Sequence, residues 1–153
     1  MSRDQIEGIR QHLRRAWFPF FSRFGQLTPV QIEVIPKILN NSNVVVAAPT
    51  ASGKTEAVVA PVAERFVVEK WQNLAILYVV PTKALAEDTF FRIKDPLNEM
   101  NIKVQIRHGD KKYLSSSLPN FLITTPESLD SLLCRKGGIF RHLRAVIIDE
   151  IHF

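Results

Sequence analysis

Short apolar runs without polar alternation are the feature that most constrains the fold of this 153-residue chain. They are rich in β-branched residues and lie at 43–48, 75–80, 102–106, 121–124 and 145–149. Such runs are typical of strands that are buried on both faces, as in a parallel sheet. Helical patterns lie between them, at 53–70, 82–98 and 126–136. This alternation predicts an α/β fold, with a mainly parallel sheet flanked by helices on both faces.

Two further helices are expected before the first apolar run. Apolar residues at helical spacing within 6–17 predict an amphipathic helix that Pro19 ends. A second helix is predicted to begin at Thr28, which has the properties of an N-cap. Pro29 would take the first helical position and Gln31 the third, so the pattern is typical of a capping box.

A candidate phosphate-binding loop follows the first predicted strand directly. Residues 48–55 read Ala-Pro-Thr-Ala-Ser-Gly-Lys-Thr, the Walker A pattern with Ala48 in place of the first glycine. Lys54 can reach the β and γ phosphates of a nucleotide, and the Thr55 hydroxyl can ligate Mg²⁺. A turn with a capping threonine would also explain these residue types. It would not explain why the segment lies directly between a predicted strand and a predicted helix. We expect the loop to bind ATP through Pro49, Thr50, Ala51, Ser52, Gly53, Lys54 and Thr55.

Two carboxylates end the last predicted strand, at Asp149 and Glu150. An apolar strand with this ending is the Walker B arrangement, although acidic residues can also simply end a strand. Asp149 is expected to hold Mg²⁺ through water, and Glu150 to orient or deprotonate the attacking water. Together with Lys54, these two carboxylates are the predicted catalytic residues.

Composition adds weaker constraints. The length suits one domain, and the 20 Lys and Arg against 15 Asp and Glu give +5, a mild bias toward polyanions. The single cysteine, Cys134, excludes an internal disulfide and is expected to be a small buried hydrophobe. The histidines match no zinc spacing. Because no apolar leader follows Met1 and no apolar stretch approaches ~20 residues, we expect a cytoplasmic location and no membrane partner.

The motifs, taken in order, resemble those of superfamily 2 helicases. Residues 24–31 resemble the Q motif, 48–55 motif I and 81–86 motif Ia. Residues 124–129 resemble motif Ib, and 149–152, Asp-Glu-Ile-His, resemble the DExH box. The resemblance covers nearly the whole chain. It implies a RecA-like P-loop NTPase domain over 1–153, with a Q-motif region at 17–31 and an ATP-binding core at 43–153.

Within the superfamily, the chain looks most like the large-helicase-related (Lhr) group, with the Ski2-like helicases second. Trp17-Phe18 leading into Phe24-Gly25 carries this resemblance, together with 107–110, Arg-His-Gly-Asp, and the DEIH box. The segment from His108 to Asp110 has an equal explanation as a tight turn.

The resemblance also implies roles for individual residues. Gln31 would recognise adenine with its amide, with Phe24 or Phe21 stacked on the base, although the capping box explains Gln31 as well. His152 would couple the hydrolytic site to the nucleic-acid motifs. The backbone of one nucleic-acid strand would be held by Pro81, Thr82, Lys83, Arg107, His108, Thr125 and Pro126. A helix N-terminus with a hydroxyl and an ammonium suits such phosphates, whereas Thr125-Pro126 also fits a simple helix start.

Parts of the family's motor are absent from these 153 residues. The Ser-Ala-Thr motif and the second RecA-like domain, which supplies arginine fingers, are not present. We therefore expect a fragment truncated after the Walker B strand, with little ATP hydrolysis of its own. An exposed edge beside 145–151 would favour aggregation or a non-native dimer.

The leading interpretation is an ATP·Mg²⁺-binding motor domain of a DNA or RNA helicase. In the full-length protein it would couple ATP hydrolysis to strand translocation or unwinding. Its expected partners are the second RecA-like domain and a nucleic-acid single strand or duplex junction, with DNA favoured over RNA. A non-catalytic, nucleotide-dependent nucleic-acid-binding module is the main alternative. A small P-loop kinase would leave the Q-like segment and motif Ia unexplained.

Overall fold

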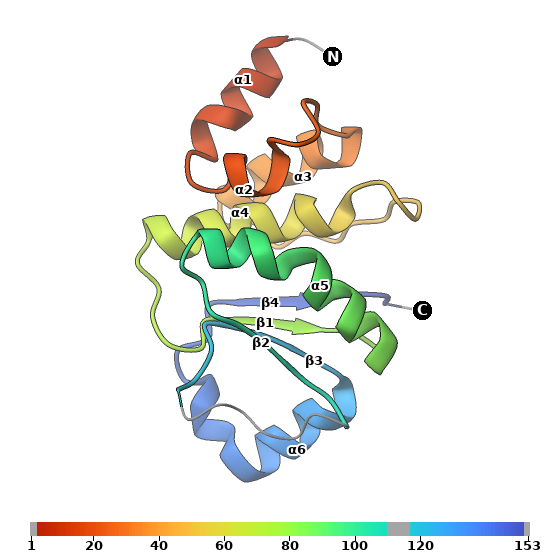
Figure 1. Ribbon diagram of the computed structural model, residues 1–153, viewed down its shortest axis with the longest axis vertical. Coiled ribbons are helices and arrows are strands. Elements are labelled where there is room, and N and C mark those ends of the chain that lie inside the picture. The colour runs from red at the N-terminus through yellow and green to blue at the C-terminus, as the bar shows by residue number, and fades with distance from the viewer. Residues whose placement is uncertain (1–2, 110–116, 152–153) are drawn as a thin grey trace. The chain divides into compact units, whose positions relative to one another are not determined.

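The chain divides into two compact units, Met1–Lys70 and Trp71–Phe153. A computed structural model describes residues 3–109 and 117–151 (Figure 1). Within these residues the first unit is helical, and the second contains a parallel sheet. No helix in the two described ranges is both long and apolar enough to span a membrane.

The first unit contains four helices in its described part. They are α1 (Arg3–His12), α2 (Trp17–Phe21), α3 (Pro29–Leu39) and α4 (Lys54–Val68). The predicted start of α3 is confirmed, because Thr28 Oγ1 accepts from Gln31 N over 3.4 Å and Gln31 Oε1 accepts from Thr28 N over 2.9 Å. This reciprocal pair satisfies two donors that a helix start otherwise leaves open. α3 packs against both α1 and α4.

The single helix predicted over 6–17 is wrong, because the chain breaks between α1 and α2. At the break, the backbone N–H of Arg15 donates to the buried carboxylate of Glu64 in α4, over 3.0 and 3.2 Å. Pro19 lies inside α2 rather than after a helix. It is tolerated there because first-turn N–H groups have no intrahelical partner.

The strand predicted at 43–48 is also wrong for the described structure. Residues 43–49 have no regular secondary structure, and the side chain of Val45 is 83% exposed. A strand is defined by hydrogen bonds to a neighbouring strand, and the described part of Met1–Lys70 contains no other strand.

The second unit confirms the predicted parallel sheet. Its strands are β1 (Ile76–Val79), β2 (Val104–Arg107), β3 (Phe121–Thr124) and β4 (Ala145–Ile148), in the order β2-β3-β1-β4. All three pairings are parallel. Its helices are α5 (Lys83–Glu99), α6 (Pro126–Lys136) and the short 3-10 helix η1 (Gly137–Phe140). Figure 1 shows α5 and α6 on opposite faces of the sheet. Because the strands are parallel, their carboxyl ends meet at one edge.

The face of the sheet beneath α6 is held by a cluster of buried side chains. Leu132 of α6 is 1% exposed and packs with Leu74, Leu77, Val79 and Leu122. Burying a leucine side chain contributes about 1.5–3 kcal/mol. This packing fixes the position of α6 against β1 and β3.

Two expected burials are wrong. In β4, alternate side chains are exposed, with Val146 at 52% and Ile148 at 59%, although the run was expected to be buried on both faces. Cys134 is exposed as well. It lies two residues after Leu132, which places it about 200° around α6 from the buried side of the helix.

Candidate functional site

In the candidate phosphate-binding loop, residues 48–55 of the first unit, the lysine side chain bonds to the backbone at the start of the loop. Lys54 Nζ donates to the carbonyl oxygen of Ala48 over 2.9 Å, and α4 begins at Lys54. Gly53 has φ +81°, and a Cβ at this position would collide with the side-chain amide of Gln31. Glycine is therefore required here both for the left-handed backbone and for the close approach of Gln31.

The same loop has hydrogen-bonding capacity that fits phosphate oxygens. Ser52 Oγ is buried and has no hydrogen-bond partner among the described residues. The N-cap of α4 is Gly53, which has no side chain to accept from the first N–H groups of this helix. Open donors at a helix N-terminus, beside an ammonium group, form a site for a phosphate group.

Gln31 joins the Q-like segment to the phosphate loop. The side chain is 6% exposed, and its Nε2 donates to the carbonyl oxygen of Gly53 over 3.2 Å. Its Oε1 is already used in the capping box with Thr28. Of the two aromatic candidates for base stacking, Phe21 is 1% exposed and Phe24 is 64% exposed. Only Phe24 of this pair presents its ring to a ligand, and adenine recognition by Gln31 stays a prediction.

The acidic pair lies at the carboxyl end of β4, in the second unit. Asp149 Oδ2 accepts from the hydroxyl of Tyr78 over 2.9 Å, and Oδ1 accepts from the backbone N–H of Glu150 over 2.9 Å. Glu150 is exposed and has φ +56°, a left-handed conformation that non-glycine residues adopt at a cost of about 1–3 kcal/mol. Strained backbone of this kind is concentrated at functional sites.

Tyr78 is a site residue that the sequence analysis missed. It lies opposite Ile147 in the β1–β4 register, and its buried side chain reaches Asp149, two positions further and just after β4. In the sequence it stands only within an apolar run. Its position beside Asp149, 71 residues later, depends on the strand order.

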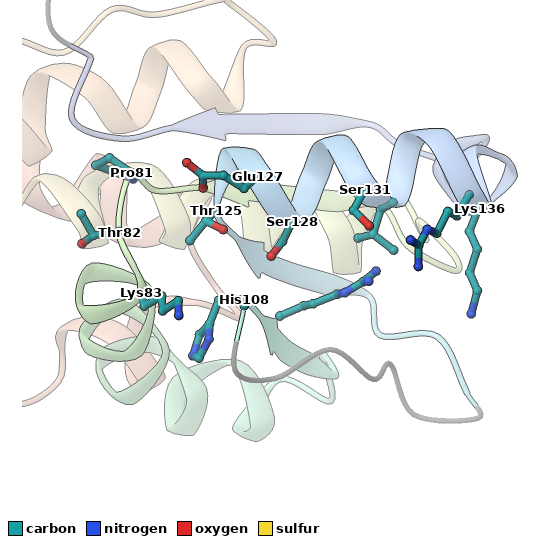
Figure 2. A pocket seen from close by; sticks show the side chains of 13 residues that line it. Pro81, Thr82, Lys83, His108, Thr125, Glu127, Ser128, Ser131 and Lys136 are labelled. Atoms are coloured by element: carbon teal, nitrogen blue, oxygen red, sulfur yellow. The ribbon is translucent and has the colours of Figure 1, made fainter.

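A cleft of about 750 Å³ lies at the carboxyl edge of the same sheet (Figure 2). It collects six of the seven residues predicted to contact nucleic acid: Pro81, Thr82, Lys83, Arg107, His108 and Thr125. Pro126 begins α6 and does not line the cleft. Gly109, Glu127 and Ser128, from the motif-like segments 107–110 and 124–129, also line the cleft. The sequence analysis missed the remaining lining residues, Ser131, Leu132, Arg135 and Lys136.

Contacts around α5 order one wall of this cleft. Thr82 caps α5, since its Oγ1 accepts from Leu85 N over 3.2 Å. Lys83 lies across Gly109, where a Cβ would be only 2.9 Å from Lys83 Cε. His108 is 4% exposed, and its Nε2 lies 2.8 Å from Glu87 Oε1 in α5. This pair ties the end of β2 to α5.

The pKa of Arg107 is lowered from its usual value, chiefly by burial and secondly by the charge of Arg135. Both arginines line this cleft. His152, predicted to couple the sites, and Asp110 lie outside the described residues.

Comparison with known proteins gives the chain's relatives. The family model for DEAD/DEAH box helicases matches residues 28–153. The chain is 35% identical over 131 residues to the ATP-dependent DNA helicase Hel308 of Pyrococcus horikoshii, across 84% of the chain and 18% of that protein. It is 34% identical over 161 residues to the Lhr helicase/probable uracil glycosylase of Mycolicibacterium smegmatis, across 92% of the chain and 11% of that protein.

A solved structure agrees with these relatives. The structure of Mycobacterium smegmatis helicase Lhr bound to ssDNA and AMP-PNP superposes with a TM-score of 0.72 and 30% identity, over 88% of this chain and 19% of that one. The chain thus spans less than a fifth of the length of each of these proteins. The likeness confirms the predicted fold, a RecA-like parallel sheet with helices on both faces.

Proposed function

Because the chain belongs to the DEAD/DEAH box helicase family, we propose that it is the ATP·Mg²⁺-binding motor part of a helicase. In the longer protein, ATP hydrolysis would drive translocation along a nucleic-acid strand or its unwinding. The family assignment confirms the resemblance to superfamily 2 helicases, and the Lhr group is among the relatives. It also favours a helicase motor over a small P-loop kinase.

The observation that carries the proposal is the geometry of the phosphate loop. Lys54 is held over the loop by Ala48, Gly53 has the left-handed backbone that the turn needs, and Ser52 Oγ is buried without a partner among the described residues. A triphosphate would supply acceptors for Ser52 Oγ, the Lys54 ammonium and the open N–H groups of α4. AMP-PNP in the related Lhr structure supports the same class of ligand.

The proposed Mg²⁺ ligands fit by their chemistry. Mg²⁺ prefers oxygen ligands and keeps several waters. Thr55, in the first turn of α4, offers a hydroxyl, and Asp149 offers a carboxylate that Tyr78 holds in place. When bound, the ion neutralises charge on phosphate oxygens. Glu150 has an exposed carboxylate, which suits the orientation of an attacking water.

The proposed partner is the backbone of a nucleic-acid single strand or duplex junction, with DNA favoured. The cleft at the carboxyl edge of the sheet supports this, because Thr82 and Lys83 begin α5 beside Arg107 and Thr125. Helix N-termini, hydroxyls and cationic side chains are the groups that contact backbone phosphates. The ssDNA in the related Lhr structure and the DNA helicase activity named for Hel308 support DNA. A second RecA-like domain in the longer protein remains part of the proposal.

The test is nucleotide binding by the Lys54→Ala variant, measured by titration calorimetry with ATP and Mg²⁺. Loss of a charge-assisted hydrogen bond costs about 1.5–3 kcal/mol, so we expect binding to weaken at least about tenfold. Lys37→Ala is the matched control, because Lys37 is an exposed lysine of the same unit that pairs with Glu33. Equal affinity of the Lys54 variant and the wild-type chain would disprove the assignment of the phosphate loop.

A further inference from the structure

The far end of the cleft contains cationic residues that no helicase motif of the sequence includes. Arg135 and Lys136 form the last turn of α6 and line the cleft together with Arg107 from β2. Among the described residues, neither the Arg107 nor the Arg135 side chain has a hydrogen bond or an ion pair. Glu127 is the only carboxylate among the described residues that line the cleft.

One side of α6 presents polar side chains to the cleft. Ser128, Ser131 and Arg135 line the cleft at positions i, i+3 and i+7, so they share one helical face. Figure 2 shows Ser128, Ser131 and Lys136 along this helix. Buried Leu132 anchors the same stretch to the sheet. The wall therefore presents two hydroxyls followed by a guanidinium on a rigid element.

Arg107 and Arg135 place two positive charges on the lining of one cleft. The charge of Arg135 contributes to the lowered pKa of Arg107, after burial, so the two groups repel each other. An anion between them removes this repulsion, and guanidinium groups suit phosphate because they donate two parallel hydrogen bonds.

The helix dipole offers a simpler explanation for part of the cluster. Cations in the last turn of a helix are stabilising by about 0.3–1 kcal/mol, which accounts for Arg135 and Lys136 without any ligand. It does not account for Arg107, which comes from a strand, or for the hydroxyls along α6. The two explanations differ in whether substitution changes ligand binding.

We propose that Arg107 and Arg135 together bind one backbone phosphate of a nucleic-acid strand that lies along α6. The inference rests on the proposed nucleic-acid function of the cleft and extends it to a second phosphate position, away from Lys83. Ser128 and Arg135 are about 10 Å apart along the helix axis. This wall is therefore long enough to face more than one phosphate of a strand.

The experiment is the salt dependence of oligonucleotide binding. Fluorescence anisotropy measures the dissociation constant of the 153-residue chain for a fluorescein-labelled oligothymidylate. The NaCl concentration is varied from about 50 to about 300 mM, a range over which affinity from phosphate contacts falls steeply. The variants are R107Q, R135Q and the double variant. R144Q is the matched control, because Arg144 is an exposed arginine of the same unit outside the cleft.

We expect each single variant to bind on the order of tenfold more weakly at low salt. The double variant should lower the slope of log K against log salt by about 0.7, the value for one phosphate on a single strand. The second substitution should cost less in the double variant than alone, because both groups bind the same phosphate. R144Q should leave the slope unchanged.

Several results would overturn the inference. A lower melting temperature of R135Q with an unchanged slope would assign Arg135 to the helix dipole alone. Displacement of the oligonucleotide by polyglutamate at equal charge concentration would point to an acidic protein segment instead. If Lys83→Ala weakens oligonucleotide binding but R107Q and R135Q do not, only this inference fails. If the wild-type chain does not bind the oligonucleotide, the proposed nucleic-acid function fails as well.

Discussion

The hydroxyl of Tyr78 donates to Asp149 Oδ2 over 2.9 Å and so joins the interior strand β1 to the acidic pair after β4. Tyr78→Phe removes this donor and keeps the ring. Hydrogen bonds to charged groups contribute about 1.5–3 kcal/mol. We therefore expect the free energy of unfolding to fall by up to about 3 kcal/mol. Urea unfolding monitored by circular dichroism measures the change.

The control for this prediction is a double-mutant cycle with Asp149→Ala. If the hydrogen bond carries the effect, Tyr78→Phe should cost little once Asp149 is absent. An equal cost in both backgrounds would assign the effect to Tyr78 packing, for instance on Phe121.

Glu64 predicts an unusual pH dependence of stability in the first unit. Burial raises the pKa of this carboxyl group above its usual value, while the backbone N–H and charge of Arg15 and the N–H of Ala16 oppose the shift. The folded chain then binds a proton more tightly than the unfolded chain does. The contribution of Glu64 to stability should therefore fall as pH rises from the ordinary glutamate pKa through the raised one, by at most about 1.4 kcal/mol per pH unit.

Glu64→Gln should flatten this dependence, which urea unfolding between pH 4 and pH 7 measures. The glutamine can still accept from Arg15 N through its Oε1. Glu33→Gln is the control, since the side chain of Glu33 is 73% exposed. Parallel pH profiles for the wild-type chain and Glu64→Gln would contradict the prediction.

Adenine recognition by Gln31 can be separated from its structural role. We expect the wild-type chain to bind ATP about tenfold more tightly than GTP, the effect of one or two hydrogen bonds to the base. Gln31→Ala should lose this preference. Thr28→Ala breaks the same capping box but keeps the amide of Gln31, so it should retain the preference. Both variants should lose about 1 kcal/mol of stability. Equal binding of ATP and GTP by the wild-type chain would refute the role of Gln31.

Neighbouring leucines of α6 give a matched pair for core packing. Leu132 is 1% exposed in the cluster beneath α6, whereas Leu133 is 54% exposed. Leu132→Ala should cost about 2–5 kcal/mol of unfolding free energy, and Leu133→Ala about 0.5 kcal/mol or less. Similar losses for the two variants would show that α6 is not anchored through Leu132.

The parallel strands of the second unit could be predicted from local pattern, because buried parallel strands read as uninterrupted apolar runs. The run at 121–124 matches β3 at both ends, and β1 and β4 lie within their predicted runs. The start of α3 was equally predictable, since Thr28 and Gln31 are only three residues apart.

Features that depend on distant residues could not be predicted. The break between α1 and α2 has a hydrogen bond to Glu64, 49 residues after Arg15. A run such as 43–48 has the composition of a strand, but composition does not determine whether a second strand lies beside it. Tyr78 beside Asp149, and Arg107 near Arg135, follow from the register and from the packing of α6. Their partners are 71 and 28 positions away in the sequence.

The hydrogen bond from Lys54 to Ala48 holds the ammonium group over the loop before any nucleotide binds. An ammonium group has three N–H donors, so Lys54 can keep its bond to Ala48 while its other N–H groups donate to phosphate oxygens. The lysine side chain is therefore already ordered, which lowers the rotamer entropy that binding a phosphate would cost. In the proposed motor the same bond would persist when the nucleotide leaves, so the lysine would not need to be ordered again in each cycle.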